Sequence, residues 1–375
     1  MYMKRIIMGI ASVAIMFLMT ACESSKSVLY SVANKDNKWG FIDRNGNEVI
    51  PCKYDYADWF SEKLILVELN DKWGFIDKDG NEVVPCKYNP DKETYINFEE
   101  GFARVISEDY KCGFIDETGN EAIPCKYDEV THFTEGLAAV MIGDYETGKW
   151  GFIDKNGNEV ITPKYDGVLG FYEGLASVWL NNKSGVIDKS GNMVIPCKYD
   201  NIWCFSEGLA PVELDEKWGF IDKNGNEVIP CKYYNAEKFS EGLAEVVIGN
   251  SYLNCKSGFI DKNGNEVIPC KYDNAEKFSN GLARVELNGK YGFIDKNGNE
   301  VIPCKYDNAE KFSNGLARVE LNGKYGFIDK NGDEVIPCKY DGAESFSDGL
   351  ARVRFDGNMQ YIDKTGRVVW SENAK

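Results

Sequence analysis

The sequence predicts an all-β repeat protein built from short antiparallel units. Residues 258–291 and 292–325 are the same 34-residue sequence, repeated without one change. A Gly-Phe-Ile-Asp or Gly-Val-Ile-Asp motif recurs nine times at spacings of 34 to 39 residues, and a worn tenth copy ends at Asp363. A fixed period in this range is typical of repeat architectures. Each unit also contains a turn-forming Asn-Gly or similar pair, further glycines and usually a proline. Because helix interiors tolerate these residues poorly, the pattern excludes helical repeats.

Each unit predicts three strands. In the second of the identical units, residues 291–295 form the first strand. An Asn-Gly turn, whose residues accept positive φ, leads into a second strand at 300–303. Residues 307–315 read as a polar connector. Apolar and charged residues alternate over 316–321, which predicts a third strand with one buried face.

From these strands we predict an elongated solenoid or superhelix of about ten three-stranded antiparallel units over residues 28–375. A lone strand at 28–33 and a hairpin at 359–370 are expected to cover the two open ends. The alternative is a β-propeller, whose blades usually have four strands and number about four to eight. Phenylalanines that recur in the connector are expected to pack between units: Phe239, Phe278, Phe312 and Phe346.

The N-terminus predicts export and lipid anchoring. A basic start at residues 4–5 precedes an apolar stretch at 6–19, which is shorter than the roughly 20 residues of a membrane helix. The segment Leu-Met-Thr-Ala-Cys that ends at Cys22 resembles the lipobox of bacterial lipoproteins. The resemblance implies a signal peptide at 1–21, a lipid on the Cys22 sulfur and a polar tether at 22–27. We therefore expect an extracytoplasmic protein, held to a bacterial membrane on its periplasmic face or at the cell surface. An ordinary signal peptide is the alternative.

Composition and residue types argue against catalysis and against nucleic acid as a partner. The net charge of −17 repels phosphate backbones. The chain has one histidine, His132, so no Ser-His-Asp or Cys-His arrangement can recur across the units. No Cys-x-x-Cys pair supports a zinc site. We expect no enzyme activity, no cofactor and no metal.

Eight of the twelve cysteines share one repeat position, and we expect them to be reduced. Equivalent positions in three-stranded units should lie about 14 Å apart, whereas a disulfide needs Cα atoms within about 7 Å. Small buried thiols that fill the core are therefore the better interpretation. The eight are Cys52, Cys86, Cys125, Cys197, Cys231, Cys270, Cys304 and Cys338.

Two units are widened at the same turn, at residues 143–149 and 249–255. Insertions fall in loops and often gather on a functional face. If the protein has a ligand, we therefore expect it near these turns, where Tyr145 and Tyr252 would supply aromatic contacts and Trp150 would extend the first patch. The alternative is that both are neutral insertions, because closure entropy rises slowly with loop length.

The repeat motif resembles a known family. Lys-Trp-Gly-Phe-Ile-Asp, followed by Gly-Asn-Glu-Val-Ile-Pro and Lys-Tyr-Asp or close variants, resembles the WG repeat (also KWG repeat) of bacterial proteins over about residues 28–370. The resemblance implies a repeat array but no particular activity. The hairpins also look like cell-wall-binding and choline-binding repeats, in which aromatic side chains cradle a ligand. That likeness makes the recurring tryptophans candidate binding residues: Trp39, Trp73, Trp150 and Trp218.

Two classes of function fit this sequence. The first is a non-enzymatic, lipid-anchored interaction module of the cell envelope that binds a protein or a cell-wall glycan through its repeats. The second is a purely structural spacer lipoprotein without a specific ligand. An envelope enzyme comes third, since no unique set of acid, base and nucleophile is present.

Overall fold

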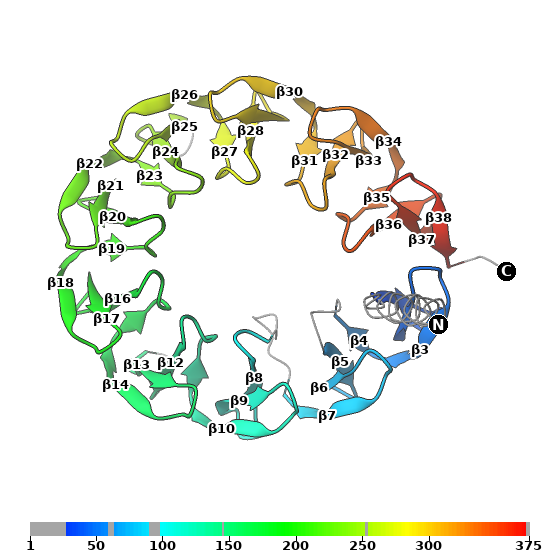
Figure 1. Cartoon of the computed structure of the whole chain (residues 1–375), viewed down its shortest axis with the longest axis horizontal. Coiled ribbons are helices and arrows are strands. Elements are labelled where there is room, and N and C mark those ends of the chain that lie inside the picture. Colours follow the sequence, from blue (N-terminus) through cyan, green and yellow to red (C-terminus); the bar gives the residue numbers. More distant parts are fainter. Residues whose placement is uncertain (1–27, 59–63, 90–97, 145, 252–253, 373–375) are drawn as a thin grey trace, which may run out of the picture.

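A computed structural model describes residues 28–58, 64–89, 98–144, 146–251 and 254–372. Within these residues the strands form ten antiparallel sheets, eight of four strands and two of three. Figure 1 shows the sheets arranged around a common centre as the blades of a propeller, with the last described strand beside the first. We number the blades 1 to 10 in chain order. No helix of the described residues is long and apolar enough to cross a membrane.

Four classes of strand recur. The innermost strands have two residues each: β4 (Tyr56–Ala57), β11 (Glu129–Val130), β15 (Gly167–Val168), β19 (Asn201–Ile202), β23 (Asn235–Ala236), β27 (Asn274–Ala275), β31 (Asn308–Ala309) and β35 (Gly342–Ala343). The second strands are β1 (Tyr30–Ala33), β5 (Ile65–Leu69), β8 (Phe102–Ile106), β12 (Leu137–Ile142), β16 (Leu175–Leu180), β20 (Leu209–Leu214), β24 (Ala244–Ile248), β28 (Leu282–Leu287), β32 (Ala317–Leu321) and β36 (Leu350–Phe355).

The third strands carry the glycine motif: β2 (Trp39–Ile42), β6 (Lys72–Ile76), β9 (Cys112–Asp116), β13 (Lys149–Asp154), β17 (Lys183–Asp188), β21 (Lys217–Asp222), β25 (Lys256–Ile260), β29 (Lys290–Asp295), β33 (Lys324–Ile328) and β37 (Asn358–Asp363). The outer strands form the rim in Figure 1. They are β3 (Glu48–Tyr54), β7 (Glu82–Tyr88), β10 (Glu121–Tyr127), β14 (Glu159–Tyr165), β18 (Met193–Tyr199), β22 (Glu227–Tyr233), β26 (Glu266–Tyr272), β30 (Glu300–Tyr306), β34 (Glu334–Tyr340) and β38 (Val368–Ser371).

The solenoid prediction was wrong, because the chain closes into a ten-bladed β-propeller of mostly four-stranded blades. The connector expected at 307–315 contains the fourth strand. There β31 pairs with β32 through Asn308↔Glu320 and Ala309↔Val319. Two residues are too few to show an alternating pattern, so the sequence gives no sign of this strand. The number of blades also exceeds the usual range.

The hairpin chemistry was predicted correctly. Asp295 Oδ1 accepts the backbone N–H groups of Asn297 and Asn299 at 2.9 Å, and Gly298 adopts a φ of 80°. The outer strand β30 runs past Pro303, where the pairing register shifts. An edge strand tolerates proline because the missing N–H does not face a second neighbour.

The two predicted end segments exist as a strand and a hairpin, but they are not caps. They pack on each other and close the ring. The Tyr361 hydroxyl donates to the Ser31 carbonyl at 2.6 Å, and the Tyr30 hydroxyl donates to the Asp348 carbonyl at 2.8 Å. A Cβ on Gly46 would lie 2.9 Å from the Val369 carbonyl oxygen, much as one on Gly119 would meet Val83. In this contact the joint between blades 10 and 1 resembles the joint between blades 2 and 3.

The connector phenylalanines pack between blades, as predicted. Each lies against the motif phenylalanine of the preceding blade, with ring centroids 4.7 to 4.9 Å apart: Phe220–Phe239, Phe259–Phe278, Phe293–Phe312 and Phe327–Phe346. The eight in-register cysteines are half-buried, and all eleven described cysteines are free thiols. Most in-register thiols lie near a carbonyl of an inner strand; Cys231 Sγ, for example, is 3.8 Å from the Val212 oxygen.

A carboxylate joins neighbouring blades at five of the joints. Glu173 of blade 5 accepts the Gly208 amide of blade 6 at 3.0 Å and pairs with Lys223 of that blade at 3.1 Å. Burial raises the pKa of Glu173, but the lysine and amide donors outweigh it, and the net pKa lies below its usual range. The equivalent residues at the other joints between blades 3 and 8 are Glu100, Glu135, Glu207 and Glu241.

Candidate functional site

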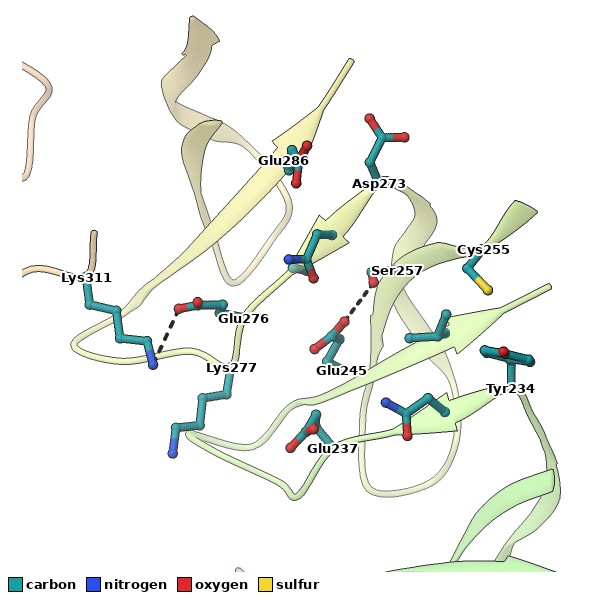
Figure 2. A pocket seen from close by; sticks show the side chains of 14 residues that line it. Tyr234, Glu237, Glu245, Cys255, Ser257, Asp273, Glu276, Lys277, Glu286 and Lys311 are labelled. Atoms are coloured by element: carbon teal, nitrogen blue, oxygen red, sulfur yellow. Dashed lines mark hydrogen bonds and ion pairs between the residues drawn. The ribbon is translucent and has the colours of Figure 1, made fainter. Parts of the chain in front are cut away.

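A cavity of about 680 Å³ lies between blades 7 and 8 (Figure 2). Its walls come from β23, β24 and β25 of blade 7 and from β27 and β28 of blade 8. Lys311, from the connector of blade 9, completes it. Five carboxylate side chains and two lysines line it: Glu237, Glu245, Asp273, Glu276, Glu286, Lys277 and Lys311. This volume lies within the range of about 300–1,000 Å³ that is typical of ligand pockets.

The identical units provide an internal reference that shows what is unusual about blade 7. Blade 8 has Asp273, Arg284 and Tyr291, with a short turn before the tyrosine. At the corresponding places, blade 7 has Tyr234, Glu245, Ser257 and the widened turn that contains Cys255. All four of these residues line the cavity. The departures from the repeat therefore converge on one place in the ring.

Loss of side-chain volume explains the cavity. In blade 8 the guanidinium of Arg284 lies 5.0 Å from the centre of the Tyr291 ring, and both side chains fill the joint with blade 9. In blade 7 a glutamate and a serine replace this pair. Blade 5 also has a serine, Ser184, in place of the aromatic residue, but its cross-strand partner is Trp179. In blade 7 the partner of Ser257 is only Val247, so the space stays open.

Glu245 is the most perturbed group in the cavity. Its side chain is buried, with 7% exposure, and its Oε1 accepts the Ser257 hydroxyl at 2.7 Å. Its Oε2 makes no hydrogen bond to any residue that the structure describes. Burial raises the pKa of Glu245 to about 7, and the carboxylates of Glu237 and Glu276 also raise it, against the lowering effect of the serine. A perturbed carboxyl in a cavity is a common sign of a functional site.

Glu237 is a second carboxylate without a cation. In blades 8, 9 and 10 the equivalent glutamate pairs with an arginine: Glu276 with Arg284, Glu310 with Arg318, and Glu344 with Arg352. Blade 7 keeps the glutamate but has lost the arginine. Within the described residues Glu237 forms no ion pair, although Lys277 lines the same cavity. No described group of three or more His, Cys, Asp or Glu side chains is placed to hold a metal.

None of the four tryptophans predicted from sequence is among the described residues that line this cavity. Tyr145 and Tyr252 lie outside the described residues. The four tryptophans are half-buried near the starts of their strands and pack against the hydrophobic core: Trp39, Trp73, Trp150 and Trp218. The widened turns themselves do border cavities. A second one, of about 530 Å³, is lined by residues 146, 148 and 149 together with Asp166, Asn181 and Asn182.

Sequence reasoning missed Glu245 and Tyr234. The sequence alone shows that Ser257 stands where most units have an aromatic residue, but not that other substitutions lie around it in space. Position-by-position comparison of blade 7 with the identical units would have identified both residues, because Tyr234 replaces an aspartate and Glu245 an arginine.

Solved structures with related architecture are distant from this chain. The computationally designed Ika8 protein is 12% identical with a TM-score of 0.41, over 73% of this chain and 93% of that one. BamB from Moraxella catarrhalis is 12% identical with a TM-score of 0.36, over 76% and 89%. Hsv2p from Kluyveromyces lactis is 8% identical with a TM-score of 0.35, over 61% and 89%. Comparison with curated proteins gives no significant match.

The family is established by the repeat itself. The model of the WG containing repeat matches nine consecutive segments: 39–73, 73–111, 113–145, 150–183, 185–218, 218–252, 258–291, 291–325 and 325–358. These segments cover most of the ten blades. The chain therefore belongs to the family of WG-repeat proteins.

Proposed function

We propose that this WG-repeat propeller is a non-catalytic interaction module of the bacterial cell envelope. It binds an envelope protein or a cell-wall glycan in the cavity between blades 7 and 8. The observation that carries the proposal is the convergence of Tyr234, Glu245, Cys255 and Ser257 on that one cavity.

The cavity is costly for the fold, which supports a functional role. An opened joint loses packing, and a buried carboxyl at 7% exposure is unfavourable unless it is paired. Sites that bind ligands often keep such destabilising features. The other class of function, a spacer without a ligand, gives no reason to retain them.

The lipid anchor is a separate part of the proposal. It rests on the lipobox-like segment that ends at Cys22, which lies outside the described residues. Replacing Cys22 by Ala should release the protein from the membrane fraction, because the acylated thiol would be missing. Unchanged membrane retention would refute the anchor and leave the binding site unaffected.

Ligand capture tests the binding function. The mature protein is immobilised, exposed to envelope extract and to cell-wall glycans, and compared with the double variant Glu245→Arg and Ser257→Tyr. This variant restores the residues of blade 8 and should fill the cavity. Glu121→Arg, an equal change of charge at an exposed site of blade 3, is the control. We expect a ligand that the wild type and the control retain and the filled variant loses. Equal capture by all three would place the binding site outside this cavity, and no capture would favour the spacer.

A further inference from the structure

We infer that the cavity between blades 7 and 8 binds a guanidinium group, such as an arginine side chain of a partner polypeptide, in the place that an arginine of the protein itself fills in blades 8 and 9. The inference rests on the proposed function and specifies the chemistry of its ligand. It is carried by the geometry of the neighbouring joints.

The joint between blades 8 and 9 shows how the fold holds a guanidinium. Arg284 pairs through Nη2 with Glu276 and donates from Nη1 to the Ala309 carbonyl of the next blade. Its guanidinium carbon lies 5.0 Å from the centre of the Tyr291 ring. The contact set is therefore one carboxylate, one carbonyl and one aromatic face.

The next joint repeats this arrangement. Arg318 pairs with Glu310, donates to the Ala343 carbonyl and lies 5.2 Å from the centre of the Tyr325 ring. The receptor is thus a recurrent property of the joint and does not depend on one local conformation.

The joint between blades 7 and 8 keeps the carboxylate and the carbonyl of this contact set but has neither the arginine nor the tyrosine. Glu237 corresponds to Glu276, and Ala275 corresponds to Ala309; both line the cavity. The arginine position is now Glu245, which adds a second carboxylate. Figure 2 shows Glu245 with Glu276 to its left and Glu237 below it, and with the hydroxyl of Ser257 as its hydrogen-bond donor.

The lining selects for a planar cation with several donors. A guanidinium presents five N–H groups in a rigid fork and can bridge two carboxylates and a carbonyl, whereas an ammonium is a single point charge. Lys311 is engaged by Glu276 at 3.4 Å, and Lys277 is the other cation of the lining. Glu237 and Glu245 therefore remain to receive the ligand.

Apolar atoms of the lining suit the rest of an arginine side chain. Val247, Cys255 and the ring of Tyr234 can cover its aliphatic stem, as apolar surfaces do for long charged side chains. Tyr234 is 37% exposed and is the aromatic side chain among the described residues of the lining. An aromatic face close to a guanidinium is favourable.

The test is a binding titration with defined probes. N-acetyl-arginine amide, N-acetyl-lysine amide and N-acetyl-citrulline amide are titrated into the mature protein at pH 8 by calorimetry. Citrulline keeps the shape of arginine and lacks its charge. We expect the arginine probe to bind at one site, at least tenfold more tightly than citrulline and more tightly than lysine. A pentapeptide with a central arginine distinguishes the two sources of the guanidinium. Tighter binding than N-acetyl-arginine amide indicates a polypeptide ligand, and equal or weaker binding indicates a small guanidino compound.

Three variants and one control variant locate the site. Glu245→Gln keeps the shape of the cavity and should lower the affinity for the arginine probe at least tenfold. E245R/S257Y should abolish binding, while E121R leaves it unchanged. The reciprocal variant R284E/Y291S opens the joint between blades 8 and 9 and should raise the stoichiometry from one to two. Circular dichroism checks that each variant is folded.

The inference is overturned if the arginine probe binds no more tightly than citrulline or if E245R/S257Y binds it as the wild type does. Its failure is distinguishable from failure of the proposed function. An envelope ligand that is lost in E245R/S257Y and is not displaced by the arginine probe would keep the binding site and remove only the guanidinium assignment.

Discussion

Replacing Glu245 by Gln should stabilise the propeller at alkaline pH and change little at acid pH. Burial raises the pKa of Glu245 to about 7, from the 4.5 of an exposed glutamate. The folded state therefore holds the proton more tightly than the unfolded state. Between these two values the folded protein binds more protons, so its stability falls as the pH rises. Glutamine keeps the shape and a hydrogen bond with Ser257 but does not ionise.

The size of the stabilisation follows from the difference between the pKa values of Glu245 in the folded and unfolded states. At about 1.4 kcal/mol per pH unit, the ionised carboxylate should cost the wild type about 3 kcal/mol above pH 8. The unfolding entropy of roughly 350 residues is about 0.7 kcal/mol per degree, so the variant should melt about 4 °C higher. Differential scanning calorimetry of both proteins from pH 4 to pH 9, at constant ionic strength, measures this difference. At pH 4 the two melting temperatures should nearly coincide.

Glu173→Gln is the control of opposite sign. The Lys223 and Gly208 donors hold the pKa of Glu173 below its usual range despite partial burial. That variant should be less stable than the wild type at pH 7, and the gap should narrow as acid protonates the wild-type carboxylate. A melting difference between wild type and Glu245→Gln that stays constant from pH 4 to pH 9 would refute the buried carboxylate in the cavity.

Three further predictions concern the ring. Tyr361→Phe removes the hydrogen bond to the Ser31 carbonyl and should cost about 1–3 kcal/mol in urea unfolding, whereas Tyr272→Phe, whose buried hydroxyl has no hydrogen-bond partner among the described residues, should cost little; equal losses would contradict this role in closure. Deletion of residues 292–325 removes one blade equivalent and should lower the melting temperature by circular dichroism, because the closing joint must rearrange; an unchanged value would show that closure adds no stability. Burial raises the pKa of Cys125, Cys231, Cys270 and Cys338 to about 11, so alkylation at pH 8 should be about 100-fold slower in the folded than in the unfolded protein; equal rates by mass spectrometry would contradict their burial.

Most of the strands and turns of each blade could be predicted from the sequence, but the closure of the ring could not. Strand alternation and the Asn-Gly turns mark three strands of each blade, because those features act within a few residues. The innermost strand has two residues, such as Asn308–Ala309, and its pairing depends on the sheet that follows. Closure depends on contacts such as Tyr361 with Ser31, which are 330 residues apart. No local pattern encodes such a contact.

The candidate site was partly predictable for the same reason. The widened turn at 249–255 and the loss of the aromatic side chain at Ser257 are visible in the sequence. The cavity itself depends on cross-strand register. Trp179 lies opposite Ser184 in blade 5, but Val247 lies opposite Ser257 in blade 7. The two serines look alike in the alignment of repeats and differ only once the strands are paired.

The joint between blades 7 and 8 contains a cavity but keeps the contacts that hold neighbouring blades together. Glu241 still accepts the Gly281 amide at 3.1 Å and pairs with Lys296 at 3.0 Å. Phe259 and Phe278 still pack with ring centroids 4.8 Å apart. The contacts that hold the blades together are therefore kept, and only the Arg-and-Tyr filling has been lost.

Because these contacts fix blade 7 against blade 8, the two walls that carry the cavity are held in place before a ligand arrives. A preformed receptor loses less conformational entropy on binding than a flexible one. If the substitutions in this joint were neutral, the Glu241 and phenylalanine contacts between the blades should be lost as readily as the arginine and tyrosine side chains. Loss of the arginine and tyrosine alone, with the contacts between blades retained, favours a binding site over neutral substitution and is the reason to test this joint first.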